Sequence, residues 1–234
     1  MVKKAYRISD DETIKWKKDG KLYCCHFELD EFSSDPRKEF DHLATMACWW
    51  NRYKLGDELP DKSPLEFLQR LVRENVSEQE FFEAVKAGKL PGIRLEPNPE
   101  NKELFDIYTV TQWQSPLGNS DPAETLDYEG VSAEGVMYAL EDDLTMNQCM
   151  TLLHENMVFL PLWIYEHSGL TISCGDRHYP YNDTWDSGQA GWIVATKDKL
   201  VKESVATEAN WREKAIDIMK AEVREYDMYL TNEV

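Results

Sequence analysis

The sequence predicts an α+β fold in which a small antiparallel sheet packs with helices, including a long amphipathic helix near the C-terminus. Two observations predict this class. Apolar residues recur at helical spacing in segments that begin with a capping residue, and β-branched and aromatic residues gather in separate short runs. The chain has 234 residues, of which 42% are hydrophobic, so it can bury a sizeable core.

A strand and a capped helix are predicted near the N-terminus. Residues 21–30 predict a strand that can form a hairpin with the preceding segment. Residues 63–75 predict a helix with Ser63 as its N-cap and Pro64 at its first position. Glu66 can complete a capping box there, because it follows the cap by three residues.

The middle of the chain mixes helical and extended patterns. A second helix is predicted over 77–87, where a serine is followed three residues later by a glutamate. Residues 91–101 predict a loop, and residues 103–114, rich in Ile, Tyr, Thr and Val, predict a strand. Helical spacing then returns, and a capped helix is predicted over 146–156.

The last third of the chain has the strongest β pattern and the longest helix. Residues 158–166, 170–174 and 189–195 predict three strands of one antiparallel sheet. Residues 211–230 predict an amphipathic helix with Asn210 as its cap, because apolar residues recur there at intervals of three and four.

Acidic residues are concentrated in one part of the chain. Between residues 95 and 158 there are thirteen carboxylates and one lysine, a net charge of −12 out of a total of −18. Aromatic residues are interleaved with these acids, which indicates a folded surface rather than a disordered acidic tail. Such a surface repels nucleic acid and membranes and attracts basic surfaces.

Several functional classes are not indicated by the sequence. The longest apolar run, residues 157–165, is too short to span a bilayer, and no signal peptide is evident. Five scattered cysteines favour reduced thiols in a cytoplasm. Because the histidines are dispersed and no phosphate-binding loop is evident, we expect no metal and no cofactor. The basic residues at 3–21 are able to contact phosphates, but acids lie among them, so we interpret the stretch as a solvated segment and expect no direct binding of nucleic acid.

Three parts of the chain carry a resemblance to other proteins. They are residues 40–57 (FDHLATMACWWNRYKLGD), the LPLWIYEHSGLTIS and WDSGQAGWI strings within 160–193, and helix residues within 211–231. Here the sequence resembles a family of small bacteriophage and mobile-element proteins of uncharacterised function. The resemblance implies a phage origin and a place of action in the host cytoplasm, and it implies no particular activity.

The acidic segment interrupts this resemblance. The resemblance implies that family members pass from the first helix, predicted here at 63–75, almost directly to the Leu-Pro-Leu strand, whereas residues 77–157 intervene in this chain. We therefore predict a discontinuous family core, residues 1–76 and 158–234, and an acidic insertion subdomain, residues 77–157.

The leading hypothesis is a non-enzymatic, phage-encoded anti-defence inhibitor of anti-CRISPR or anti-restriction type. Carboxylates spaced on a folded surface can imitate the phosphates of DNA or RNA and occupy a basic groove of a host nucleic-acid-handling protein. Aromatic side chains would anchor the contact. A charged face that only keeps the protein soluble is the alternative. The residues predicted to bind the partner are Glu103, Asp106, Trp113, Asp127, Tyr128, Glu129, Glu141, Asp142 and Asp143.

Two other functions remain open on the sequence. A small hydrolase can be assembled from His167 as base, Asp186 as orienting acid and Ser187 or Ser168 as nucleophile. Neither serine lies in a Gly-x-Ser-x-Gly motif, and both segments are also typical of turns between strands. The third possibility is a phage accessory protein that forms homo-oligomers through an uncovered apolar face of helix 211–230.

Overall fold

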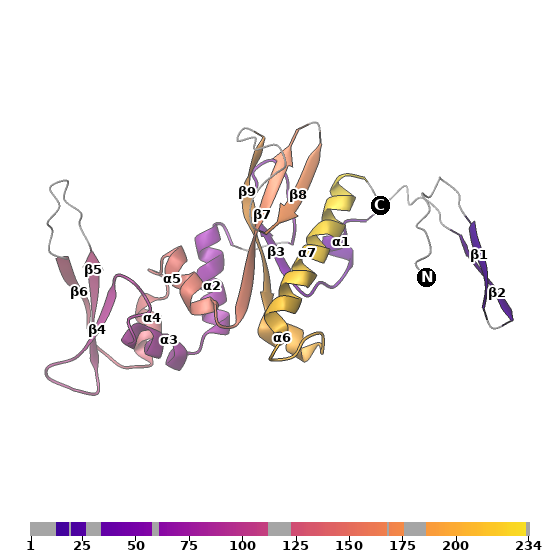
Figure 1. The fold of residues 1–234 in the computed structure, drawn as a ribbon. Helices are drawn as coiled ribbons and strands as arrows, with labels where there is room; N and C mark the ends of the chain where they lie inside the picture. The colour runs from indigo at the N-terminus through magenta and orange to yellow at the C-terminus, as the bar shows by residue number, and fades with distance from the viewer. Residues whose placement is uncertain are drawn as a thin grey trace.

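Figure 1 shows the computed structural model, which describes residues 13–18, 20–26, 34–57, 61–111, 123–167, 169–175 and 186–232. The fold is α+β, as predicted. The elements follow in this order: β1 (Thr13–Lys18), β2 (Lys21–His26), α1 (Pro36–Glu39), β3 (Thr45–Cys48), α2 (Pro64–Asn75), α3 (Glu78–Lys86), β4 (Ile93–Pro97), β5 (Phe105–Thr111), β6 (Ala123–Val131), α4 (Gly135–Leu140), α5 (Met146–Leu153), β7 (Met157–Glu166), β8 (Leu170–Cys174), β9 (Ser187–Thr196), α6 (Lys197–Lys202) and α7 (Trp211–Leu230).

Within the described ranges the strands form three antiparallel sheets. β1 and β2 form a hairpin, β4, β5 and β6 form a three-stranded sheet in that order, and a four-stranded sheet has the order β3-β9-β7-β8. The strands predicted at 158–166, 170–174 and 189–195 are confirmed as β7, β8 and β9, and β7 pairs with both of the others. The strand predicted at 21–30 is confirmed as β2, although its residues 27–30 lie outside the described part of the chain.

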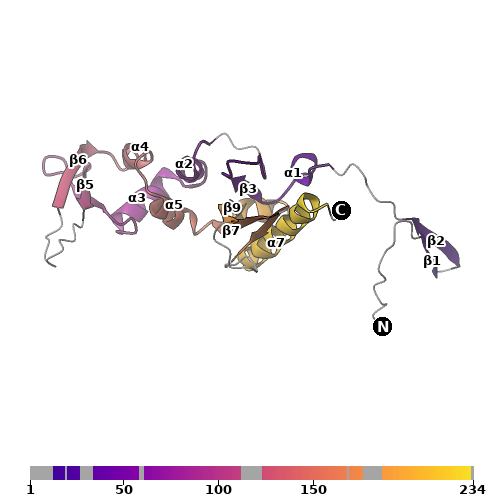
Figure 2. The same cartoon turned by 90° about the horizontal axis from the view of Figure 1, so that it is seen from above.

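The four-stranded sheet has a hydrophobic cluster on each face, because consecutive side chains of a strand point to opposite sides. On β9, Ile193 and Ala195 pack in the cluster that contains α7, whereas Val194 between them packs in the cluster that contains α2. Met46 and Ala47 of β3 divide in the same way. Figures 1 and 2 show α7 and α2 on different sides of this sheet.

Helix α7 covers one of these faces with its apolar stripe. The apolar residues of α7 that are buried there are Trp211, Ala215, Met219, Val223 and Tyr226. The stripe that was considered for self-assembly is therefore occupied by the sheet, and a second copy could reach it only by displacing this packing. No helix in the described residues is both long enough and apolar enough to cross a membrane.

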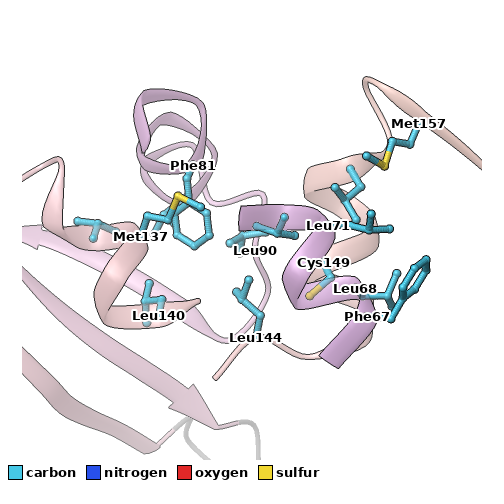
Figure 3. Packing of buried hydrophobic residues seen from close by; sticks show 14 of the residues in the cluster. Phe67, Leu68, Leu71, Phe81, Leu90, Met137, Leu140, Leu144, Cys149 and Met157 are labelled. Atoms are coloured by element: carbon cyan, nitrogen blue, oxygen red, sulfur yellow. The ribbon is translucent and has the colours of Figure 1, made fainter. Parts of the chain in front are cut away.

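Helices α2, α3, α4 and α5 pack between the four-stranded and the three-stranded sheet (Figures 1 and 3). One hydrophobic cluster runs through them, and Phe67 of α2, Phe81 of α3 and Cys149 of α5 are fully buried in it. The cluster reaches Ile107 of β5 at one end and Val194 of β9 at the other. It therefore includes residues on both sides of the predicted boundary between residues 76 and 77, so the segments on either side of that boundary share one interior.

Two strands of the three-stranded sheet were not expected from the sequence. The prediction of a loop over 91–101 is wrong at β4, which pairs with β5 along its whole length. β6 has the largely polar sequence AETLDYEGV, in which apolar and polar residues alternate only from Leu126 to Glu129. Both strands form because β5, which carries the buried Ile107, lies between them and pairs with each. Tertiary pairing thus overrides weak local propensity.

The predicted helix caps are only partly confirmed. The capping boxes at α3 and α5 are present. At α2 the Ser63 side chain accepts from Glu66 N at 3.2 Å, but the Glu66 carboxylate accepts from Lys62 N at 3.1 Å instead of from Ser63 N. At α7 the Asn210 side chain makes no cap bond, because its Oδ1 accepts from the backbone and hydroxyl of Thr207.

Candidate functional site

β6 forms an exposed edge of the three-stranded sheet. It pairs with β5, and its first seven residues are all exposed. Leu126 is 46% exposed and Tyr128 is 37% exposed, while Glu124, Asp127 and Glu129 place carboxylates on the same strand. Large apolar side chains exposed together with charged neighbours are typical of an interaction surface.

A groove of about 640 Å³ lies beside this strand, between the sheet and the α4–α5 region. Its lining includes Leu126, Asp127 and Tyr128 of β6 and Asp143, which follows α4. The Asp127 carboxylate also accepts a hydrogen bond from the hydroxyl of Thr109 on β5. The structure thus brings together Asp127, Tyr128 and Asp143, three residues predicted to bind a partner. Apolar and acidic side chains line one concave site there.

The turn between α4 and α5 contains Glu141, Asp142 and Asp143. It is held to α2, because Gln69 Nε2 donates a hydrogen bond to the backbone oxygen of Asp142 at 2.8 Å. Arg73 of α2 also pairs with the Asp142 carboxylate at 3.0 Å. The Asp142 side chain remains 87% exposed, so this ion pair contributes about 1 kcal/mol or less to stability. The turn is therefore fixed in place while Asp142 and Asp143 stay exposed and Glu141 is partly buried.

Three of the predicted partner-binding residues lie elsewhere. Asp106 on β5 is only 4% exposed, and its Oδ1 accepts hydrogen bonds from Asn98 Nδ2 at 2.8 Å and from Gly130 N at 2.9 Å. Its assignment to the surface is corrected: it joins the turn before β5 to the end of β6. Glu103 is exposed in that turn but does not line the groove. Trp113 lies outside the described residues.

Arg94, which was not identified as functional from the sequence, contacts residues of all three strands of this sheet. Arg94 on β4 pairs with Glu96 at 2.5 Å and with Glu124 of β6 at 2.5 Å. Its guanidinium lies over the ring of Tyr108 on β5, 5.0 Å from the centroid. Arg94 therefore contacts all three strands and neutralises part of the local charge. No spacing rule relates residues 94 and 124, so only strand pairing reveals this contact.

The alternative catalytic residues lie at one end of the four-stranded sheet. Nδ1 of His167, which follows β7, is 2.9 Å from Oδ2 of Asp186, which precedes β9. Glu166 N also donates to the backbone oxygen of Asp186 at 2.7 Å, so strand pairing positions this contact. The His167 side chain is 64% exposed and that of Asp186 is 37% exposed. Ser187 is partly buried at the start of β9, and Ser168 lies outside the described residues.

A second charge pair adjoins this histidine. Arg52 Nη1 is 2.9 Å from Oε1 of Glu166, and the Tyr53 hydroxyl donates to the same oxygen at 3.3 Å. The hydrogen bond from Arg52 holds the pKa of Glu166 below its ordinary value. Arg52 and Glu166 both fall within the strings that carry the phage-protein resemblance. The presence of both residues in these strings is the sequence feature that could have indicated this contact, because their residue types alone did not.

Cys48 and Cys149 do not provide an activated nucleophile. All five cysteines are free thiols. Burial raises the pKa of Cys48 to about 12 and that of Cys149 to about 11, so both are protonated near neutral pH. In the part of the chain that is described, no three His, Cys, Asp or Glu side chains come together to hold a metal ion.

Comparison of the chain with protein-family models, with curated proteins and with solved structures found no match. The resemblance to bacteriophage and mobile-element proteins therefore stays a prediction. What supports a function is the geometry of the groove beside β6 and, separately, the contact between His167 and Asp186.

Proposed function

We propose that this protein is a non-enzymatic, phage-encoded anti-defence inhibitor, of anti-CRISPR or anti-restriction type, that acts in the host cytoplasm. It would bind a basic groove of a host nucleic-acid-handling protein. One observation carries the proposal: β6 exposes carboxylates together with large apolar side chains, beside a groove, in the most acidic segment of the chain.

The acidic surface is defined as Leu126, Asp127, Tyr128 and Glu129 of β6 together with Asp143. Asp127 and Glu129 are both exposed two residues apart on β6, whose pairing with β5 is irregular around Asp127, and they form a short row of carboxylates along the strand. Such a row offers a basic groove a pattern of negative charge like that of a nucleic-acid backbone. Tyr128 and Leu126 add the desolvated contacts that long-range charge does not supply.

Reversing Asp127, Glu129 and Asp143 to Lys is expected to abolish partner binding without unfolding the protein, because none of the three belongs to a hydrophobic cluster. The measurement is capture from host lysate with the affinity-tagged protein, elution with a salt gradient and identification by mass spectrometry. The unaltered protein should release a nucleic-acid-binding complex at moderate salt, since exposed charges are screened beyond roughly 8–10 Å. Nucleic acid added to the lysate should compete with this capture.

A matched control reverses Glu203, Asp217 and Glu225, which are exposed on other elements and change the net charge by the same amount. Asp142 is left unaltered in both variants, because a lysine there would face Arg73. Equal capture by the two variants would contradict the assignment of the acidic surface. An empty eluate from the unaltered protein would contradict the proposed function itself.

A second candidate function is a small hydrolase, favoured by the 2.9 Å contact between His167 Nδ1 and Asp186. An imidazole whose Nδ1 is held by a carboxylate can accept a proton at Nε2 from a nucleophile such as Ser187. The exposure of this pair weighs against the hydrolase, because catalytic sites are normally concave and exclude water.

Replacing His167 with Ala is expected to abolish any turnover of chromogenic ester or phosphoester substrates if this second candidate is correct. The melting temperature should fall by about 2 °C or less, because an exposed ion pair contributes about 1 kcal/mol or less. His154→Ala, at another exposed histidine, is the control. Turnover that survives in His167→Ala would rule out a hydrolase that uses His167. Turnover by the unaltered protein should not depend on salt, whereas binding driven by exposed charges should weaken as salt increases.

A further inference from the structure

The β1–β2 hairpin places two aromatic rings side by side. Antiparallel pairing sets Trp16 opposite Tyr23, and their rings stack with centroids 5.5 Å apart at an interplanar angle of 12°. The two residues are nevertheless 41% and 40% exposed. Because rings that stack on each other use one face each, the pair still presents aromatic surface to solvent.

The same hairpin is basic within an acidic chain. Residues 13–26 contain four lysines and one aspartate, whereas the whole chain carries −18. Lys15, Lys17 and Lys21 are exposed. Lys21 precedes Tyr23 by two residues and so lies on the side of the rings, while Lys15 and Lys17 extend to the other side of this narrow ribbon. The β1–β2 hairpin, residues 13–26, thus combines aromatic rings with positive charge.

We propose that the β1–β2 hairpin binds single-stranded nucleic acid. Bases would stack on Trp16 and Tyr23, phosphates would meet Lys21 beside the rings, and Lys15 and Lys17 would reach the strand around the edge of β1. Stacking on aromatic side chains tolerates any base but requires bases that are unpaired, and lysines add an attraction that depends on salt rather than on sequence. This site goes beyond the proposed function and does not rest on it.

The aromatic pair is what changes the interpretation of these lysines. As a sequence they indicate only a solvated basic segment, whereas the register of the hairpin places a ring platform among them. Duplex nucleic acid fits this platform less well, because its bases already stack on one another. At about 0.1 M salt the Debye length is about 10 Å, so acids farther than this from the hairpin lysines are largely screened.

The test is a titration of a labelled oligothymidine with the full chain, followed by fluorescence anisotropy. It is repeated at salt concentrations between about 0.1 M, where the Debye length is about 10 Å, and about 0.4 M, where the Debye length is shorter. The logarithm of the binding constant should fall with the logarithm of salt with a slope of about −2, since each of three lysine contacts adds roughly −0.7. Reversal of Lys15, Lys17 and Lys21 to Glu should abolish binding. A matched reversal of three other exposed lysines, Lys89, Lys202 and Lys214, should leave it unchanged.

The rings are tested separately from the charges. Trp16→Ala and Tyr23→Ala should each weaken oligothymidine binding about tenfold, and the conservative variants Trp16→Phe and Tyr23→Phe should retain most of it. An alanine variant can also unfold the hairpin. The lysine reversals leave both rings in place and therefore decide the proposal independently.

Three results would overturn the proposal. The first is that oligothymidine does not bind to the unaltered protein at about 0.1 M salt, or that it binds equally well to the variant with Lys15, Lys17 and Lys21 reversed and to the variant with Lys89, Lys202 and Lys214 reversed. The second is a duplex of the same length that binds as tightly as the single strand. The third is that oligothymidine does not bind, while light scattering gives a dimer mass for the unaltered protein and a monomer mass for the variant with Lys15, Lys17 and Lys21 reversed. That result would show that the hairpin binds a second copy of the chain.

Discussion

Replacing Arg37 with Met is expected to lower the free energy of unfolding by about 3–5 kcal/mol. The Arg37 side chain is 0% exposed, and its guanidinium pairs with Asp57 through Nε at 2.8 Å and with Glu222 through Nη1 at 2.8 Å. Nη2 donates further hydrogen bonds to Asp57 and to the backbone oxygen of Ala44. The replacement would leave the carboxylates of Asp57, which is 25% exposed, and Glu222, which is 11% exposed, without the arginine that compensates them.

The same carboxylates organise the backbone around β3 and α7. Glu222 Oε1 accepts hydrogen bonds from the backbone nitrogens of Leu43 at 2.9 Å and Ala44 at 3.2 Å. Asp57 Oδ2 accepts from Met46 N at 2.9 Å. Burial alone would lower the pKa of the Arg37 guanidinium, but its bonds to the two carboxylates raise that pKa overall. Arg37 therefore stays charged at neutral pH and joins α1, β3 and α7.

Urea denaturation followed by circular dichroism measures this effect, and the melting temperature should fall by roughly 10 °C. Lys38→Met is the control, because Lys38 is 56% exposed and pairs with Asp35 only at 3.4 Å; its effect should be within about 0.5 kcal/mol. Adding Asp57→Asn and Glu222→Gln to Arg37→Met should recover part of the loss, since these changes remove the uncompensated charges. An Arg37→Met protein as stable as the original would contradict the prediction.

Replacing Gly191 with Ala is expected to lower the free energy of unfolding by more than about 4 kcal/mol. Gly191 on β9 pairs with Cys48 on β3. A Cβ atom at Gly191 would lie 1.9 Å from the backbone oxygen of Ala47 and 2.9 Å from its carbonyl carbon. Because these are backbone atoms of the neighbouring strand, no side chain can move aside, and β3 would have to separate from β9.

Soluble yield and urea denaturation of the Gly191→Ala protein measure this second effect. Gly169→Ala, in the turn between β7 and β8, is the matched control, because a Cβ there would meet nothing within 4 Å. The control should change the free energy of unfolding by about 0.5 kcal/mol or less. A Gly191→Ala protein that unfolds at the same urea concentration as Gly169→Ala would show that β3 does not pack against β9 as closely as described.

Elements with strong local signals were predicted correctly. The helices α3 and α5 start at capping boxes whose two partners are three residues apart, and β7, β8 and β9 follow alternating or β-branched runs. Elements whose signals are weak within their own segments were missed. β4 and β6 are polar or only partly apolar, and they become strands because β5 supplies a partner on either side.

The candidate site was predictable only in part. The sequence located the acidic segment and named Asp127, Tyr128 and Asp143, which the fold brings to one groove. It could not distinguish these residues from Asp106, because the spacing of acids along a chain does not reveal which of them a sheet buries. The two rings of the β1–β2 hairpin were likewise visible only as residue types until their register was known.

By itself, the sequence determined the charge of this protein, its α+β class and those elements whose start and periodicity depend on neighbours a few residues away. The tertiary structure alone decided which acids are exposed, which are neutralised by Arg94, and how Arg37 meets Glu222. The last two residues are 185 positions apart. Contacts of this kind depend on how sheets and helices pack over long separations, and no local spacing encodes them.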